Sequence, residues 1–522
     1  MSPESFLRDL HADPSRSKPL DWEVDWEDAP LAYKLYRGLP AISLSPEVPL
    51  VLGGRERGPK PDLTGLGHLL WYAYGLTQLS HSCAADPTAR PMQMHRRFVP
   101  SGGGLYPNEL YVYLKTKDAP DGIYHYDAAH HRLVLLREGD YDSFLASALG
   151  NRCKVSACFG AIFVSTVFWK NYYKYNHFAY RLQGLDAGVL IGQSLEAAKR
   201  FGYAARVYYQ FLDRAVNRLL GLSDREESVY AVIPLSAEPA DDWFSDGSGE
   251  SGNISSTELC RQLEEIRHDH YVRSRYIKPY PMLIHMNEAS MIEYPGAFRR
   301  AGAAPDADSG VRAAYLPRVD RPMYDLAAVC RKRYSPESEF VAGKVTAEQA
   351  GALLQDATAS CTYRNDLDGP RDNPASRVSL YLCMHQVEGV PDGAYRYDAA
   401  THALRRLFPG DHRHRLQQAM YLNNVNLFQV PLCLHAAGNK NFLIPELGYR
   451  GYRIQQMETG ILVQRLLLAA SAAGLGGRPL LGFHADRCDE IYDIAPQGKT
   501  SLIQIPIGPY HHRSRLEGGL HA

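Results

Sequence analysis

The chain of 522 residues lacks the features that mark an exported, membrane-bound or nucleic-acid-binding protein. Its charges nearly cancel, with 57 Lys and Arg against 58 Asp and Glu, so no global field favours nucleic acid or an anionic membrane. The N-terminus has no apolar export segment. The most apolar stretch, 461–475, contains Gln464 and Arg465 and is too short to span a bilayer. We therefore expect a cytoplasmic protein with no membrane or nucleic-acid partner.

Closely spaced cysteine pairs are also missing. None of the nine cysteines belongs to a C-x-x-C pair, and most have apolar neighbours, as in Leu382-Cys383-Met384. That pattern is typical of reduced, buried thiols and not of a disulfide framework or a zinc site. We expect no metal.

What the chain does have is an internal repeat. The segment from Asp121 to Ala129, DGIYHYDAA, returns as DGAYRYDAA from Asp392, 271 residues later. The segment from Tyr180 to Gly188, YRLQGLDAG, returns as YRIQQMETG from Tyr452, 272 residues later. Two copies in the same order and nearly constant register indicate a homodimer fused into one polypeptide.

The repeat divides the chain into a wrapping segment (1–60), a first unit (61–235), a linker with a charged helix at 257–273 (236–320) and a second unit (321–522). Aromatic and branched runs predict strands, and apolar residues at helical spacing predict long helices over 186–201 and 458–473. The pattern predicts an α+β fold with mixed or antiparallel sheets. We expect the two long helices to pack together as the core of an internal pseudo-dimer, because the second is apolar almost all round.

Two short segments have the composition of a ligand site. Pro100-Ser101-Gly102-Gly103-Gly104 is no phosphate loop, but its glycines would let the backbone lie flat against a planar ligand. Arg333 and Ser335 precede a helix start with a capping-box pattern at Thr346 and Gln349, and Arg with hydroxyl groups suits a phosphate. A tight turn and a solvated surface loop are the respective alternatives.

The sequence around Lys174-Tyr175 is unusually aromatic from Phe168 to Tyr180. These rings either form the wall of a pocket for a heteroaromatic substrate or pack as ordinary core. Lys174 and Tyr175 are either proton-transfer groups or a surface lysine beside a core tyrosine. His177 is either a further proton carrier or a structural histidine.

Together these motifs resemble the FMN-dependent nitroreductase superfamily, and more closely its SagB/ThcOx-type azoline dehydrogenases, in a tandem form of two nitroreductase-like units. The resemblance implies that FMN lies at the interface between the units. The first unit would supply Pro100, Ser101, Gly102, Gly103 and Gly104. The second would supply Arg333, Ser335, Gly476, Leu480, Leu481, Gly482 and the tail residues Arg513 and Arg515.

The two units keep complementary parts of this pattern. The first has no Arg-x-Ser element, and the second reads Asp372-Asn-Pro-Ala-Ser-Arg377 where its glycine loop should be. This complementarity predicts one intact flavin site and one degenerate site. The resemblance also places Glu337 where the family has a second Arg, so we expect Glu337 to point away or to pair with Arg333.

In the related dehydrogenases a Lys-Tyr pair assists proton removal, a role that the resemblance assigns to Lys174 and Tyr175. The expected activity is dehydrogenation of a thiazoline or oxazoline in a peptide or carrier-bound intermediate, and a biosynthetic complex is the expected setting. An NAD(P)H-dependent nitro or quinone reductase is the first alternative. A non-catalytic flavin-binding or scaffold protein is the second.

Overall fold

The structure is a computed structural model. It describes residues 2–12, 19, 22–53, 61–82, 92–238, 243–244, 254–302, 313–320, 324–359, 363–368, 376–512 and 516–519. Statements below refer to these residues.

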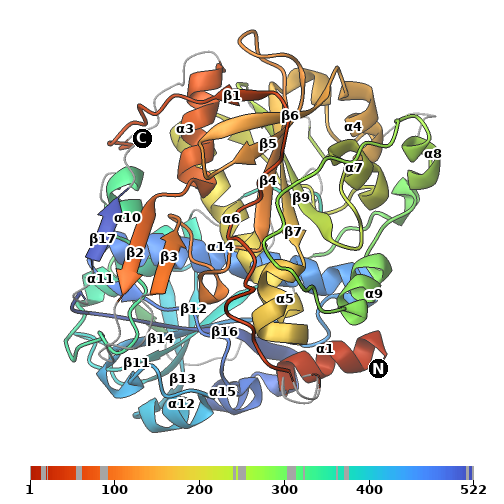
Figure 1. Ribbon diagram of the computed structural model, residues 1–522. Helices are drawn as coiled ribbons and strands as arrows, with labels where there is room; N and C mark the ends of the chain where they lie inside the picture. The colour runs from red at the N-terminus through yellow and green to blue at the C-terminus, as the bar shows by residue number, and fades with distance from the viewer. Residues whose placement is uncertain are drawn as a thin grey trace.

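Two seven-stranded sheets form the body, one in each half of the chain (Figure 1). The first has the order β1 (Ala41–Ser43), β6 (Arg132–Glu138), β5 (Gly122–Asp127), β4 (Asn108–Leu114), β7 (Gly160–Val167), β9 (Glu227–Ser236), β8 (Ala204–Ala205). The second has the order β10 (Ala313–Tyr315), β13 (Ala403–Pro409), β12 (Gly393–Asp398), β11 (Ser379–Met384), β14 (Leu432–Asn439), β16 (Lys499–Gly508), β15 (Gly476–Gly477). Neighbouring strands in both sheets pair in the antiparallel direction. The same strand order in both halves confirms the predicted duplication and the α+β class.

The helices follow the same repeat. The first half contains α3 (Leu63–Tyr74), α4 (Asp142–Ala148), α5 (Trp169–Tyr175), α6 (Ala179–Arg200) and α7 (Asp213–Leu220). The second half contains α10 (Leu326–Lys332), α11 (Ala347–Ala359), α12 (Arg413–Ala419), α13 (Ile444–Leu447), α14 (Tyr449–Ala472) and α15 (Ala485–Tyr492). Outside the two units lie α1 (Pro3–Ala12), α8 (Ser256–Cys260) and α9 (Pro281–Ala289). The predicted capping box starts α11, with Thr346 and Gln349 exchanging backbone-to-side-chain hydrogen bonds of 3.0 Å.

The long helices α6 and α14 pack against each other between the two sheets, as predicted (Figure 1). They approach closely at Gly188 and Gly460, which are equivalent in the repeat. A methyl group on Gly188 would collide with the Met457 carbonyl, and one on Gly460 with the Leu185 carbonyl. Both helices are buried along nearly their whole length, so neither presents a polar face to water. Burial on all sides agrees with the sequence of the second helix, which is apolar almost all round.

A third, smaller sheet joins the end of the chain to the first half. In it β17 (Leu516–Gly519) pairs with β2 (Gln78–Ser82), which pairs with β3 (Met92–Arg96). The last described residues therefore cross from the second unit to the first. None of the described helices is both long and apolar enough to cross a membrane.

One prediction outside the repeated units was wrong in extent. The charged helix expected over 257–273 ends at Cys260. Beyond it the chain pairs with the N-terminal segment instead, with Tyr271 N–H donating to the Leu35 carbonyl and a bridge between Tyr36 and His270. Tertiary pairing here overrides local helical preference. The N-terminal segment begins with the helix α1, whose Phe6 and Leu10 are buried.

Candidate functional site

A cavity of about 2410 Å³ lies between the two halves of the chain. Residues that the sequence singled out line it from both sides. The first half contributes Pro100–Gly104, Lys174 and Tyr175, and the second contributes Arg333, Ser335 and Leu480–Gly482. Ser101 and Arg333, 232 residues apart in the chain, therefore face one shared cavity.

The glycine loop is tied to the long helix α6 by one carboxylate. Ser101 Oγ donates a hydrogen bond of 2.6 Å to Asp186 Oδ2, and Gly102 N–H donates one of 3.2 Å to Asp186 Oδ1. Gly103 and Gly104 have φ angles of 66° and 68°, a left-handed conformation that favours glycine. Asp186, which sequence reasoning did not choose as a site residue, thus fixes the shape of the loop. Its equivalence with Glu458 in the repeat was the available signal.

Burial raises the pKa of Asp186 to about 7, although the hydrogen bonds from Ser101 and Gly102 oppose the shift. Between about pH 4 and pH 7 the folded protein therefore holds a proton that the unfolded chain has released, and the free energy of unfolding falls as pH rises. Asp186→Asn should remove this dependence, on the order of a few kcal/mol across the window. Denaturant unfolding at pH 4.5 and pH 8 would measure it. If the difference in free energy of unfolding between the wild type and Asp186→Asn is the same at both pH values, the assignment is wrong.

Lys174 and Tyr175, at the end of α5, lie directly over the glycine loop. A methyl group on Gly103 would be 2.5 Å from the Tyr175 hydroxyl and 2.9 Å from Lys174 Nζ. Burial lowers the pKa of Lys174 and raises the pKa of Tyr175 to about 12. Of the surrounding aromatic run, Tyr173 and Phe178 also line the cavity. His177 does not; its ring packs against Phe6 and Tyr172.

Arg333 is held on the opposite side of the cavity. Its Nε donates to the Phe98 carbonyl at 2.8 Å, and its Nη1 donates to Ser335 Oγ at 3.1 Å. Burial lowers the pKa of this guanidinium, and no acidic side chain among the described residues forms an ion pair with it. Of the two alternatives expected for Glu337, pairing with Arg333 is not observed. The partner of Glu337 is Arg478, so the carboxylate at the motif's second position is neutralised by another cation.

Leu480–Gly482 contribute backbone to the cavity wall. The N–H groups of Leu481 and Gly482 donate no hydrogen bond to any described residue, whereas the Gly482 carbonyl accepts one of 2.8 Å from Tyr421 N–H. Gly476 lies off the cavity wall, where a methyl group would meet Pro336 at 2.5 Å. The predicted tail residues Arg513 and Arg515 lie outside the described part of the chain.

The equivalent position in the other half is filled by the chain itself. Tyr209 and Gln210, which correspond to Leu481 and Gly482, donate their N–H groups to the Asp366 carboxylate at 2.9 and 3.0 Å. Arg377 is buried there against Glu458 and Asp368, at 2.6 and 2.7 Å. The Asp366 carboxylate and the ion pairs of Arg377 thus fill, in this half, the position that is open beside Leu481 and Gly482 in the other half. The loop residues 372–375, expected to be degenerate, lie outside the described residues.

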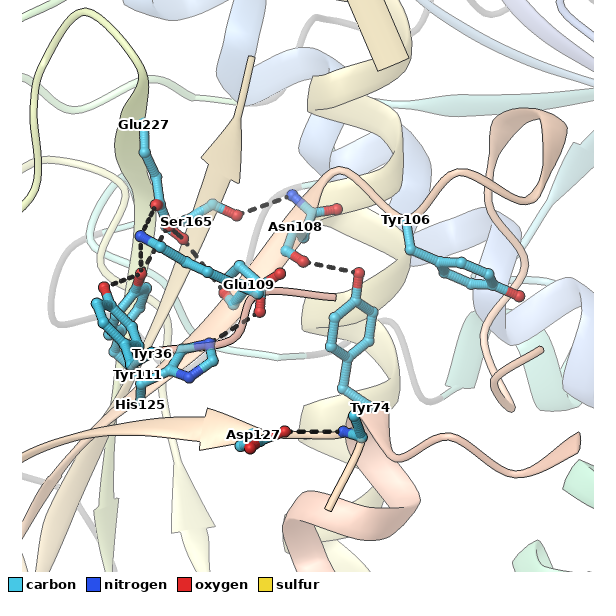
Figure 2. Close-up of polar contacts among 12 residues, drawn as sticks. Tyr36, Tyr74, Tyr106, Asn108, Glu109, Tyr111, His125, Asp127, Ser165 and Glu227 are labelled. Carbon is cyan, nitrogen blue, oxygen red and sulfur yellow. Dashed lines mark hydrogen bonds and ion pairs between the residues drawn. The ribbon is translucent and has the colours of Figure 1, made fainter. Parts of the chain in front are cut away.

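Behind the glycine loop lies a buried polar network (Figure 2). Glu109, the second residue of β4, forms a short ion pair with Lys170 of α5, and its Oε2 accepts a hydrogen bond of 2.9 Å from His125 Nε2. A second group joins Tyr111 to Glu227 at 3.0 Å and Glu227 to Lys34 at 2.7 Å. The Glu109–Lys170 pair fixes α5, and therefore Lys174, relative to the loop.

Comparisons with known proteins agree with this geometry. The sequence model of the nitroreductase family matches residues 59–235 and 330–508. The chain belongs to the nitroreductase family. The crystal structure of a protein from Anabaena variabilis that bears the name nitroreductase superposes with a TM-score of 0.74, covers 97% of this chain and 99% of its own, and is 23% identical. That likeness concerns the fold.

Two curated relatives match one part of the chain each. MJ1384 of Methanocaldococcus jannaschii, which carries a nitroreductase name, is 25% identical over 170 residues, 33% of this chain and 84% of that protein. The trifolitoxin-processing protein TfxB of Rhizobium leguminosarum bv. trifolii is 29% identical over 192 residues, 34% of this chain and 49% of that protein.

Members of the family generally bind FMN, and the cavity fits that group. Two free N–H groups at Leu481 and Gly482 suit the polar edge of a planar ring, and Arg333, which has no acidic partner among the described residues, suits a phosphate. The cavity also exceeds the ~300–1,000 Å³ of ordinary ligand pockets. It therefore has room for a second molecule beside the cofactor.

Proposed function

We propose that the protein is an FMN-dependent dehydrogenase that oxidises an azoline, a thiazoline or oxazoline ring in a peptide or carrier-bound biosynthetic intermediate, to the aromatic azole. The observation that carries this proposal is the placement of Lys174 and Tyr175 over the glycine loop of a cavity that both halves line. The similarity to TfxB, a protein named for processing trifolitoxin, supports a role in peptide maturation.

Different residues would bind the phosphate and the ring system of FMN. Arg333 and Ser335 would hold the phosphate, since a buried guanidinium and a hydroxyl provide charge and directed hydrogen bonds. Ser101–Gly104 and Leu480–Gly482 would face the ring system by backbone, and the tail residues Arg513 and Arg515 would add positive charge. The ion pairs of Asp366 and Arg377 would exclude a second cofactor from the equivalent position.

Aromatising an azoline removes a proton from one ring carbon and two electrons with the second hydrogen from its neighbour. Bound FMN would supply the two-electron acceptor. Lys174 would take the proton, because burial lowers its pKa and so favours the neutral amine that a base requires. Tyr175, whose pKa is raised, would stay protonated and donate a hydrogen bond to a ring heteroatom or to the neighbouring carbonyl of the substrate. Oxygen or another acceptor would then reoxidise the cofactor.

The test is to purify the full chain, measure its flavin and supply an azoline-containing peptide. We expect one FMN per chain and a product two hydrogens lighter by mass spectrometry. A colourless protein that binds no added FMN would refute the proposal and favour the scaffold alternative. A yellow protein that NADPH bleaches rapidly and that leaves the azoline unchanged would identify the reductase instead.

A further inference from the structure

The ammonium group of Lys174 has aromatic rings on two sides. Lys174 Nζ lies 5.2 Å from the centroid of the Trp26 ring and 4.9 Å from that of Tyr175. Trp26 belongs to the N-terminal segment and lines the cavity, yet its side chain is 60% exposed. A single exposed apolar ring is ordinary on a protein surface. This one differs because it lines a cavity and lies over the amine of a lysine.

A chain of hydrogen bonds holds Trp26 in this place. The Asp28 carboxylate accepts from the N–H groups of Arg275 and Tyr276 at 2.7 and 2.9 Å. Ser274 Oγ donates to the Asp28 carbonyl at 2.8 Å and accepts from Trp169 Nε1 of α5 at 2.9 Å. The connection thus runs from α5 through 274–276 to the N-terminal segment and returns to α5 where Trp26 meets Lys174. Asp28 and Ser274 are buried, which keeps water from competing for these bonds.

We call this connection of Trp26, Asp28 and residues 274–276 the Trp26 clamp. None of these residues belongs to the repeated units. Trp26 and residues 274–276 lie outside 59–235 and 330–508, the ranges that match the family. Apart from its contacts with α5, the clamp therefore lies outside the segments that the family model matches, and it ends on the lysine of the proposed function.

We propose that Trp26 is a positioning and specificity residue, which holds the Lys174 amine against the glycine loop and presents its exposed ring as the outer wall for a planar heterocycle. The inference rests on the proposed function for the identity of the heterocycle. The ring is suited to both tasks: an indole face attracts the ammonium group that Lys174 becomes once it has taken the proton, and it stacks on flat apolar molecules. Tyr173, which meets Trp26 edge to face at 6.3 Å, supports the indole from behind.

The first measurement does not depend on turnover. The flavin-containing protein is treated with a limiting amine-reactive reagent, and labelling of Lys174 is followed by mass spectrometry of its peptide. Trp26→Ala should raise the labelling rate roughly two- to fivefold by releasing the cation–π contact. Asp28→Ala, which loosens the clamp without touching the cavity, should do the same. Trp26→Phe should stay near wild type. Tyr276→Ala, which removes a 67%-exposed ring from the same clamp, is the matched control and should change nothing.

The second measurement is azoline turnover by the same variants. Trp26→Ala should lower kcat about 10- to 100-fold, as expected for a misplaced catalytic group, and raise KM, while Trp26→Phe restores most of kcat. Unchanged labelling and turnover in Trp26→Ala would overturn the inference even if the wild-type protein oxidises azolines. Conversely, if labelling responds as expected and the wild-type protein oxidises no azoline, the positioning role stands and the proposed function falls.

Discussion

Lys174→Ala should slow azoline dehydrogenation by about 10²- to 10⁴-fold, the range for loss of a proton-transfer group, while the protein keeps its flavin. The reason is local. Lys174 forms no ion pair with an acidic side chain among the described residues, so its removal leaves no buried charge without a partner. Folding and cofactor binding should therefore be nearly unchanged. The measurement is single-turnover flavin reduction by an azoline peptide, with flavin content determined in parallel.

Two further variants show what Lys174 does. Lys174→Arg keeps the positive charge but cannot accept a proton near neutral pH, so it should be as slow as Lys174→Ala if Lys174 is the base. Tyr175→Phe should have a smaller effect, because a phenol with a raised pKa contributes a hydrogen bond and not a charge. Wild-type turnover should increase with pH as the Lys174 amine loses its proton. Full activity in Lys174→Ala would refute the assignment even if the flavin is bound as proposed.

The repeated parts of the chain were the most predictable from sequence. Each strand of the two seven-stranded sheets recurs after a nearly constant interval, and the complementary losses of the two units predicted that Ser101 and Arg333 would face one cavity. The long helices begin earlier than predicted, at Ala179 and Tyr449, because their first turns contain polar residues that are buried by tertiary contacts. Arg450, for example, is paired with Asp213 of the first half at 2.7 Å.

What could not be predicted depends on contacts between distant segments. Glu337 forms an ion pair with Arg478, and Arg377 forms ion pairs with Glu458 and Asp368. No local sequence pattern indicates these partners. The residues 261–273 have the composition of a helix but form backbone hydrogen bonds with the N-terminal segment. That pairing brings Trp26 to Lys174, so the segments that carried the weakest sequence signal form the outer wall of the cavity.

Lys170, one helical turn before Lys174, should respond to substitution in the opposite way. Lys170 and Glu109 are both almost fully buried and form an ion pair. Burial lowers the pKa of Lys170, and Glu109 opposes the shift. Burial alone would raise the pKa of Glu109, but Lys170 and His125 hold it well below its ordinary value. Lys170→Met would leave the carboxylate buried without its cation, and we expect a loss of about 3–5 kcal/mol in the free energy of unfolding at neutral pH.

The pH dependence separates this mechanism from a simple packing defect. In the wild-type protein the contribution of Glu109 is present above its unfolded pKa and is lost as pH falls, because the pKa is depressed in the folded state. In Lys170→Met the carboxyl is left to burial, which raises its pKa, so the variant gains stability as pH falls and Glu109 is protonated. The difference in free energy of unfolding between the two proteins should therefore narrow from pH 7 toward pH 4.5 in denaturant unfolding.

The double variant that combines Lys170→Met with Glu109→Gln should recover most of the lost stability at neutral pH. Lys174→Ala, from the same helix, is the matched control and should cost less than about 1 kcal/mol, because a lysine without an acidic partner leaves nothing unpaired. If Lys170→Met is as stable as Lys174→Ala, the ion pair does not fix α5, and the position of Lys174 over the glycine loop must depend on the Trp26 clamp alone.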